Sequence, residues 1–246
     1  MIKIDILSRI SDVDRRESIS EQLAILNDIV FFNFVDAITP ASLPENIKKS
    51  SSLLTGGERC CALGHILMCL RLLDSNEPYR IFMEDDASID LDRFKDIESA
   101  LRFFHNDFDV IILGYSKVDE ELKSKIQFFR PLFKVLKYKG YKLGIPYKNW
   151  KCGTVSYSIS KEGARKLVEI NSDCIYTSDD WFQFSQKGLK IAHLMPIVVT
   201  EQYVKFTSSL ESERNTFRQR AMILRYSAGV LRHIRCFIAY LKYKIF

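Results

Sequence analysis

Three carboxylates stand side by side in this chain at Glu84, Asp85 and Asp86, directly after the apolar residues Ile81-Phe82-Met83. Like charges placed this close repel one another unless a cation or hydrogen bonds compensate them. Carboxylate oxygens suit Mn²⁺ or Mg²⁺, and such an ion, completed by phosphate oxygens, neutralises a departing pyrophosphate. The triplet therefore predicts a site for Mn²⁺ or Mg²⁺. The alternative is that the acids cap the next helix or face water.

A second acidic pair, Asp179 and Asp180, lies between Ser178 and Trp181. A carboxylate in a binding site can act as a general base, and an indole ring beside it can stack against a sugar. Ser and Asp also favour the position just before a helix. The pair is thus a candidate catalytic base or a plain helix cap.

A glycine turn at Gly56-Gly57 leads into a helix, where backbone N–H groups can receive an anion or a nucleotide. Thr55 is placed to cap that helix with Glu58 as its capping-box partner, and His65 follows two turns later. The alternative is a plain capped helix with a packed histidine. Gly153 permits a close approach of the backbone, and a structural strand–turn–helix is the default interpretation there.

These candidates depend on strands and helices that alternate along the chain. Strands are expected at Ile2–Leu7, Ile29–Val35, Tyr79–Met83, Phe108–Leu113, Thr154–Ile159 and Ile191–Val199, the last interrupted by Pro196. Helices are expected at Glu17–Asp28, Cys61–Leu73, Leu91–Phe104, Lys161–Ile170 and Trp181–Gln186. Residues 115–150 are less regular and suit a hairpin or a lid.

This alternation predicts an α/β protein, with a Rossmann-like mixed sheet of mostly parallel strands and helices on both faces. In open sheets of this kind, ligands bind at the carboxyl ends of the strands. The acidic triplet follows such an end, so the predicted ion lies where a ligand is expected.

The length of 246 residues and the 47% hydrophobic content suit one domain, residues 1–210, followed by a tail, residues 211–246. The net charge is +5, yet Arg214–Phe246 holds eight basic and no acidic residues, so the remainder is mildly acidic. Apolar residues of the tail fall on one helical face and arginines on the other. This pattern favours an anionic membrane surface over nucleic acid, and the alternative is a helix docked on the protein's own core.

The six cysteines include no C-x-x-C pair, and the first residues lack the apolar segment of a secretory signal. No apolar run reaches the roughly 18 residues that a spanning helix needs. We therefore expect free thiols in a reducing cytosol, with the protein peripheral on the inner face of the cytoplasmic membrane.

Taken in order, several segments resemble glycosyltransferase family 25, which includes lipooligosaccharide galactosyltransferases and collagen-type galactosyltransferase domains. The resemblance spans about Ile4 to Ser209. It rests on Asp14-Arg15-Arg16, Phe34-Val35-Asp36-Ala37, Gly57-Glu58 with Cys61–His65, Glu84-Asp85-Asp86, Asp109–Gly114, Gly153-Thr154 with Tyr157–Ser160 and Gly163-Ala164, and Asp180-Trp181. One departure is Gly64, where family members often have Ser before the histidine.

The resemblance implies a GT-A type fold, a UDP-sugar donor, most often UDP-galactose, and a lipooligosaccharide or other glycan acceptor. It also implies a divalent metal at the acidic triplet and inversion at the anomeric carbon, which is the outcome of a β-galactosyltransferase. The alternatives are another nucleotide-using enzyme, such as a nucleotidyltransferase, and a non-catalytic glycan-binding protein.

Carried over by position, Asp86 and Glu84 would serve the metal and the diphosphate, with Asp85 between them. Asp180 would be the base and Asp179 the second candidate. The donor side would be lined by Arg16, Asp36, Glu58, His65 and Gly153.

Overall fold

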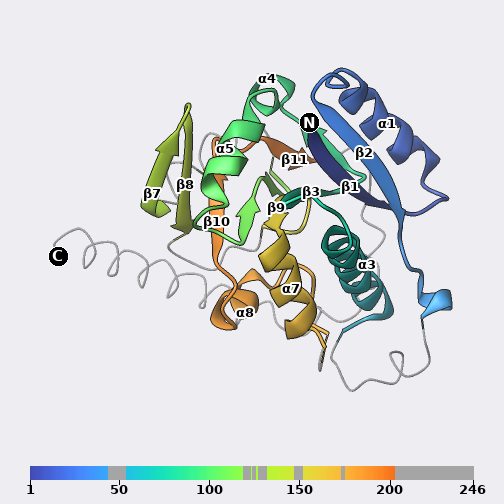
Figure 1. Ribbon diagram of the computed structural model, residues 1–246. Helices are drawn as coiled ribbons and strands as arrows, with labels where there is room; N and C mark the ends of the chain where they lie inside the picture. Colours follow the sequence, from blue (N-terminus) through green and yellow to red (C-terminus); the bar gives the residue numbers. More distant parts are fainter. Residues whose placement is uncertain are drawn as a thin grey trace, which may run out of the picture.

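The computed structural model describes residues 1–43, 54–118, 123, 126, 132–146, 152–172 and 175–202 (Figure 1). Eight strands of this part form one sheet. They are β1 (Ile2–Ser8), β2 (Val30–Asp36), β3 (Tyr79–Glu84), β5 (Val110–Ile112), β7 (Leu132–Tyr138), β8 (Tyr141–Pro146), β9 (Ser156–Ser160) and β10 (Ile191–Met195). A smaller sheet contains β4 (Ala87–Ile89), β6 (Gly114–Tyr115) and β11 (Val199–Glu201).

The order of strands in the large sheet is β2-β1-β3-β9-β5-β10-β8-β7. Strand β1 runs parallel to β2 and β3, and β5 runs parallel to β10. Strand β9 lies antiparallel between β3 and β5, and β8 and β7 are also antiparallel to their neighbours. Six of these eight strands therefore run in one direction, in line with the expectation of mostly parallel strands, while β9 and β8 run the other way and make four of the seven neighbouring pairs antiparallel. The mixed α/β sheet is confirmed.

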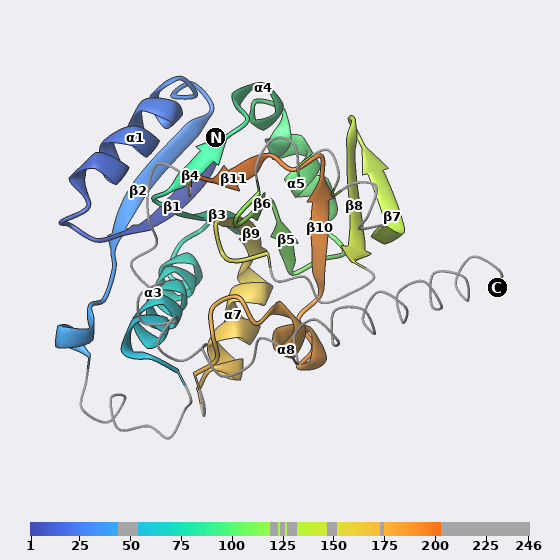
Figure 2. The ribbon, with the colours of Figure 1, turned by 180° about the vertical axis from the view of Figure 1, so that it is seen from behind.

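Helices cover both faces of the large sheet, as predicted (Figures 1 and 2). The helices are α1 (Val13–Ala24), η1 (Pro40–Ser42), α3 (Gly56–Leu73), α4 (Leu91–Phe94), α5 (Ile97–Phe104), α7 (Lys161–Ile170) and α8 (Trp181–Gln186). Side chains of α1, α4 and α5 share one buried cluster with Ile81 and Met83 of β3. Side chains of α3, α7 and α8 share a second cluster with Phe82. Successive strand residues thus feed opposite cores, which is the period of two that a strand imposes.

Several boundaries differ from the expected ones. Helix α1 begins at Val13, four residues before the expected start at Glu17, and ends at Ala24, four residues before the expected end at Asp28. The expected helix Leu91–Phe104 is divided into α4 and α5. Pro196 separates β10 from β11, so that one expected strand serves two sheets.

The β7–β8 hairpin lies within the segment where a hairpin or lid was expected. The tail Arg214–Phe246 and the end of the proposed domain lie outside the described residues. Within the described ranges, none of the helices combines the length and the apolar character needed to cross a membrane.

Candidate active site

A cavity of about 270 Å³ opens at the carboxyl ends of β1, β2 and β3. The parallel register aligns these ends, since Ser8 pairs with Asp36 and Leu7 pairs with Glu84. The cavity is lined by Leu7, Ser8, Arg9, Asp12, Arg15, Ala37, Ile38, Thr39, Pro40, Gly57, Cys60, Cys61, Glu84 and Asp85. Its volume lies near the lower end of the range for ligand sites, about 300–1,000 Å³. This is the edge of the sheet where a ligand was predicted.

A larger hollow of about 600 Å³ lies between α5 and the β7–β8 hairpin. Its lining includes Phe103, Arg102 and Tyr138 but none of the predicted site residues. It lies away from the carboxyl ends of β1 and β3, so we place the candidate active site in the smaller cavity.

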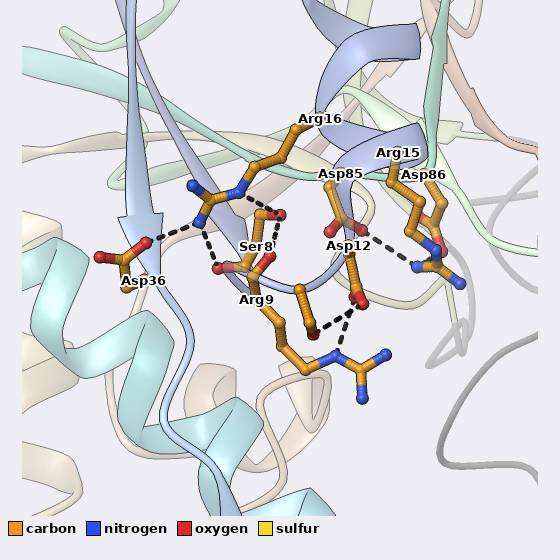
Figure 3. A network of polar contacts seen from close by, with 9 residues as sticks. Ser8, Arg9, Asp12, Arg15, Arg16, Asp36, Asp85 and Asp86 are labelled. Carbon is orange, nitrogen blue, oxygen red and sulfur yellow. Dashed lines mark hydrogen bonds and ion pairs between the residues drawn. The ribbon is translucent and has the colours of Figure 1, made fainter.

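Two consecutive arginines in the first turn of α1 point in different directions, and Arg15 lines the cavity (Figure 3). Arg16 donates from Nη2 to Asp36 Oδ1 at 2.6 Å and to the carbonyl oxygen of Ser8 at 3.0 Å. Its Nε donates to Ser8 Oγ at 3.1 Å, and its guanidinium lies 4.7 Å from the ring centre of Phe34. The structure therefore brings together Arg16 and Asp36, two of the residues predicted to line the donor side.

Arg15 turns instead toward the acidic triplet (Figure 3). Its Nη1 donates to Asp85 Oδ1 at 3.0 Å and to Asp86 Oδ2 at 3.2 Å. All three side chains are largely buried, with 16% of Arg15 and 7% of each aspartate exposed. Arg15 thus supplies a positive charge to the acids, a role that the sequence reasoning did not assign to it.

One arginine does not compensate all of this negative charge. Burial, together with the neighbouring charges of Glu84 and Glu201, raises the pKa of Asp86 to about 8. Burial also raises the pKa of Asp85, although Ser8 and Arg15 oppose the shift. The Oδ1 atom of Asp86 is buried and has no hydrogen-bond partner among the described residues. A further cation at this point would satisfy that oxygen and return the carboxyl to its ionised form.

The third acid of the triplet faces another group of side chains. Glu84 ends β3, accepts a hydrogen bond from Thr154 Oγ1, and lies with Oε1 3.8 Å from His65 Nε2. Ligand atoms of Cys61, His65 and Glu84 come within 4.8 Å of one another, the one such group of three among the described residues. In this arrangement the three predicted metal ligands do not form one set, because Glu84 belongs to the strand whereas Asp85 and Asp86 lie in the turn after it.

The carboxylate oxygens of these three acids are suitable ligands for a hard divalent cation. Asp85 and Glu84 line the cavity, and Asp86 offers a buried oxygen without a partner. Carboxylate oxygens at one or two positions, completed by phosphate and water, are the usual set for Mg²⁺. Rotation of side chains would be needed to direct all three acids at one ion.

The predicted cap of α3 is confirmed. Glu58 N donates to Thr55 Oγ1 at 3.2 Å, and Thr55 N donates to Glu58 Oε2 at 3.1 Å. The cavity wall on this helix consists of Gly57, Cys60 and Cys61, so Glu58 lies beside the cavity as a capping residue. Its predicted contact with a donor stays a prediction.

His65 lies behind the cavity wall and is only 2% exposed. Its Nδ1 is 2.9 Å from Tyr157 Oη, and its Nε2 is directed toward Glu84. Burial alone would lower the pKa of His65, but Cys61 and Glu84 outweigh it and raise the pKa to about 9. His65 can therefore act on the cavity through Glu84, while its own ring is packed in the core.

Gly153 has a φ of +72°, and a Cβ atom there would come within 1.7 Å of Ser116 Oγ. Its carbonyl oxygen accepts a hydrogen bond of 2.9 Å from Trp181 Nε1. Trp181 is only 5% exposed and contacts Tyr157 edge to face. The expectation of a sugar-stacking wall at Trp181 was therefore wrong, because the indole packs in the core with its N–H satisfied.

Asp180 caps α8, and its Oδ1 accepts a hydrogen bond of 3.2 Å from Gln183 N. The helix-cap interpretation is thus confirmed, and the catalytic role of Asp180 or Asp179 stays a prediction. Ser178, two residues before Asp180, has its Oγ 3.2 Å from the Sγ atom of Cys61, a residue of the cavity wall. The 178–180 segment is therefore held against the α3 side of the site.

Sequence reasoning missed Arg15, Cys61, Thr154 and Tyr157. A signal existed for two of them. Cys61 and His65 are four residues apart on a predicted helix and so share one face. Arg15 precedes the predicted donor residue in the first turn of a helix that starts near a strand end. The contacts of Thr154 and Tyr157 depend on how β9 pairs in the sheet.

Comparison with known proteins identifies the family of this chain. The model of glycosyltransferase family 25, described as lipopolysaccharide biosynthesis proteins, matches residues 1–182. The lipooligosaccharide biosynthesis protein lic2B of Haemophilus influenzae is 25% identical over 231 residues, 86% of this chain and 83% of that protein. The lacto-N-neotetraose biosynthesis glycosyltransferase LgtE of Neisseria meningitidis serogroup B is 26% identical over 250 residues, 89% of this chain and 84% of that protein.

Among solved structures, the galactosyltransferase LgtC, in complex with donor and acceptor sugar analogs, aligns with 81% of this chain and 86% of its own at 11% identity and a TM-score of 0.42. The family model spans most of the 246 residues and includes the acidic triplet and both arginines of α1. This chain therefore belongs to glycosyltransferase family 25, with the GT-A type fold which that membership implies, and is a glycosyltransferase.

Proposed function

We propose that the protein transfers galactose from UDP-galactose to a lipooligosaccharide or lipopolysaccharide glycan, with inversion at the anomeric carbon and with the help of Mn²⁺ or Mg²⁺. The observation that carries the proposal is the cavity at the ends of β1, β2 and β3, where Arg15 bonds two acids of the triplet and Arg16 bonds Asp36 at the end of β2. The acceptor class is supported by the names of the relatives, which are lipooligosaccharide and lacto-N-neotetraose biosynthesis proteins.

The charges around the cavity suit a nucleoside diphosphate. Gly57 lies in the first turn of the 18-residue helix α3, where N–H groups and the helix dipole favour an anion. Arg15 and Arg16 add two guanidinium groups, which bind phosphate oxygens well. Asp36, held by Arg16 and 61% exposed, is free on its outer side to accept hydrogen bonds from hydroxyl groups of the donor.

Asp85, Asp86 and Glu84 would hold the divalent cation, which, when bound, neutralises charge on the departing diphosphate. Support comes from the unsatisfied Oδ1 of Asp86 and the raised pKa of its carboxyl. When the two aspartates bind a cation, Arg15 is released from them and can pair with a phosphate oxygen. Cation binding by the two aspartates would in this way favour binding of the donor's phosphates by Arg15.

The reaction would be a single displacement. Asp180, or Asp179 as the second candidate, accepts the proton of an acceptor hydroxyl, and that oxygen attacks the anomeric carbon on the face opposite UDP. The bond from that carbon to the UDP oxygen breaks as the new glycosidic bond forms. The attachment of Ser178 to Cys61 supports this role, because it holds the acidic pair near the cavity wall.

A pair of conservative variants tests the base. Asn caps helices as well as Asp does, so Asp180→Asn should leave α8 intact. We expect kcat to fall by about 10²–10⁴-fold while UDP affinity, measured by calorimetry, is nearly unchanged. Asp179→Asn tests the second candidate in the same assay, and the variant that loses transfer identifies the base. Transfer at the wild-type rate in Asp180→Asn would show that this carboxylate is not the base.

The donor and the cation are tested together. UDP-galactose, UDP-glucose and UDP-N-acetylglucosamine are compared on a lipooligosaccharide acceptor with Mn²⁺ and then with a chelator. We expect the highest kcat/KM for UDP-galactose, loss of transfer with the chelator, and a β-linked product by NMR. Full activity in the chelator would contradict the cation, and an α-linked product would contradict inversion.

For the tail we propose an anionic membrane surface as the partner, which would place the protein on the inner face of the cytoplasmic membrane. The support is the set of eight basic residues without an acid in Arg214–Phe246. A chain ending at residue 213 should still act on a soluble acceptor but lose binding to vesicles that contain phosphatidylglycerol. Undiminished vesicle binding would refute the role of the tail.

A further inference from the structure

Cys61, His65 and Glu84 form a compact group beneath the cavity wall. Cys61 and His65 occupy successive turns of α3, and Glu84 comes from the end of β3, which packs beside that helix. One ligand atom from each residue lies within 4.8 Å of the other two. A thiol, an imidazole and a carboxylate therefore converge from two separate elements.

The surrounding side chains orient this group. His65 Nδ1 is 2.9 Å from Tyr157 Oη, which leaves Nε2 directed at the group. That Nε2 is buried and has no hydrogen-bond partner in the described part of the chain. Thr154 Oγ1 donates to Glu84 Oε1. Metal-binding histidines and carboxylates usually have such partners, which fix their orientation.

We propose that Cys61, His65 and Glu84 form a binding site for Zn²⁺, separate in its chemistry from the hard-cation site at Asp85 and Asp86. Zinc bonds of about 2.0–2.3 Å at tetrahedral angles place neighbouring ligand atoms roughly 3.3–3.7 Å apart. The distance of 3.8 Å from His65 Nε2 to Glu84 Oε1 is already close to that range. Thiolate and imidazole favour zinc over Mg²⁺ and Mn²⁺.

Binding forms three bonds from the protein to zinc and displaces water molecules from the ion. The Cys61 thiol proton and the Nε2 proton of the charged His65 ring are both released to solvent, and His65 binds through Nε2 with its remaining proton on Nδ1, directed at Tyr157. The fourth position is open to water or to Ser178, whose Oγ is 3.2 Å from Cys61 Sγ. Because Cys61 and Glu84 line the cavity, zinc would occupy its wall.

Zinc bound there would withdraw Glu84 from the donor site and inhibit transfer. This consequence rests on the proposed function, whereas zinc binding itself does not. The two are separated by measuring binding on the full chain with the metal alone, without donor or acceptor. Failure of the transferase assay would then leave the binding result intact.

The test uses Zn²⁺ for affinity and Co²⁺ as a spectroscopic probe. We expect one zinc per chain by calorimetry, and a thiolate-to-cobalt charge-transfer band that zinc abolishes. X-ray absorption of the zinc complex should show one sulfur ligand and otherwise nitrogen or oxygen. Two or more sulfur ligands, or none, would overturn the proposal without the need for any variant.

Variants then assign the ligands. Cys61→Ala should weaken zinc binding by at least 100-fold and remove the charge-transfer band, and Tyr157→Phe should weaken binding by about 10–100-fold. Cys60→Ala is the matched control, because Cys60 is adjacent in sequence but outside the group, and it should bind zinc as the wild type does. Unchanged zinc affinity in a folded Cys61→Ala chain would refute the site.

Discussion

Replacing Arg15 with Met tests whether this arginine holds the acidic residues of the site. Removing one partner of a buried ion pair typically lowers the free energy of unfolding by about 3–5 kcal/mol. Arg15 is 16% exposed and bonds both Asp85 and Asp86, so the loss should approach that range. The pKa of Asp86 is about 8, so its carboxyl is already mostly protonated at neutral pH, and this reduces the cost. We expect Arg15→Met to lower the free energy of unfolding by about 2–4 kcal/mol at pH 7.

The stability lost in Arg15→Met should also depend on pH. The pKa of Asp86 is raised in the folded state above its ordinary value of 3.8, and loss of Arg15 should raise it further. A folded state that binds more protons than the unfolded state loses stability as the pH rises through the folded pKa. The difference between Arg15→Met and wild type should therefore be larger at pH 9 than at pH 6.

The assay is urea unfolding at pH 6, 7 and 9, with and without Mn²⁺. An ion that binds only the folded chain adds about 2.7 kcal/mol at a concentration of 100 times its Kd, so Mn²⁺ should restore much of the loss. Arg102→Met is the control, because Arg102 is 75% exposed and pairs with the surface residue Glu98. Its loss should lower the free energy of unfolding by about 0.5 kcal/mol or less. Equal stability of the two variants would refute the dependence of the acids on Arg15.

Three further predictions concern stability. Burial lowers the pKa of His105 from 6.5 to about 4, so its neutral ring contributes stability above pH 6.5 that is lost as the pH falls toward 4. In urea unfolding, the free energy of unfolding should therefore fall by about 3 kcal/mol between pH 6.5 and pH 4, and this contribution should be absent in His105→Gln. Gly153→Ala should lower the melting temperature, because φ is +72° and the new Cβ would meet Ser116; a melting temperature equal to that of wild type would contradict this strain. Gly64→Ser should lower the free energy of unfolding, measured by chemical denaturation, by about 1–3 kcal/mol, because a Cβ there would lie 2.7 Å from Leu7 Cδ1. Adding Leu7→Ala should make room for the serine and remove this loss.

The fold could be predicted where local pattern decides it. The capping box at Thr55 and Glu58 placed the start of α3 correctly, and the apolar run before Glu84 placed β3. The direction of β9 could not be predicted, because period-two alternation is the same in parallel and antiparallel strands. That direction brings Thr154 and Tyr157 next to residues of α3 and β3, so their contacts could not be foreseen either.

The candidate site was predictable in its location but not in its pairings. Adjacent carboxylates at a strand end indicated the right edge of the sheet, and Arg16 and Asp36 meet there as predicted. The division of the triplet between Arg15 and the Cys61–His65 pair depends on where β3 ends and the turn begins. Strand boundaries are the least certain part of a sequence reading, and here one residue decides which face a carboxylate occupies.

The departure at Gly64 illustrates a different limit. Family members often carry Ser before the histidine, and the sequence alone shows only that this chain does not. The structure supplies the reason, since the Leu7 side chain occupies the space that a larger residue would need. That a small residue at position 64 makes room for the side chain of Leu7 can be seen only once the contact between the two residues is known.

The turn that carries Asp85 and Asp86 is tied to the sheets on both sides. Glu84 N donates to Val155 O at 3.0 Å, and Asp86 O accepts from Gln202 N at 2.7 Å, just before β4 pairs with β11. Its main chain therefore has little conformational entropy left to lose when a ligand arrives. Capture should require only rotation of side chains, and the amide protons of residues 84 and 202 should exchange with deuterium no faster in the free protein than in the liganded one.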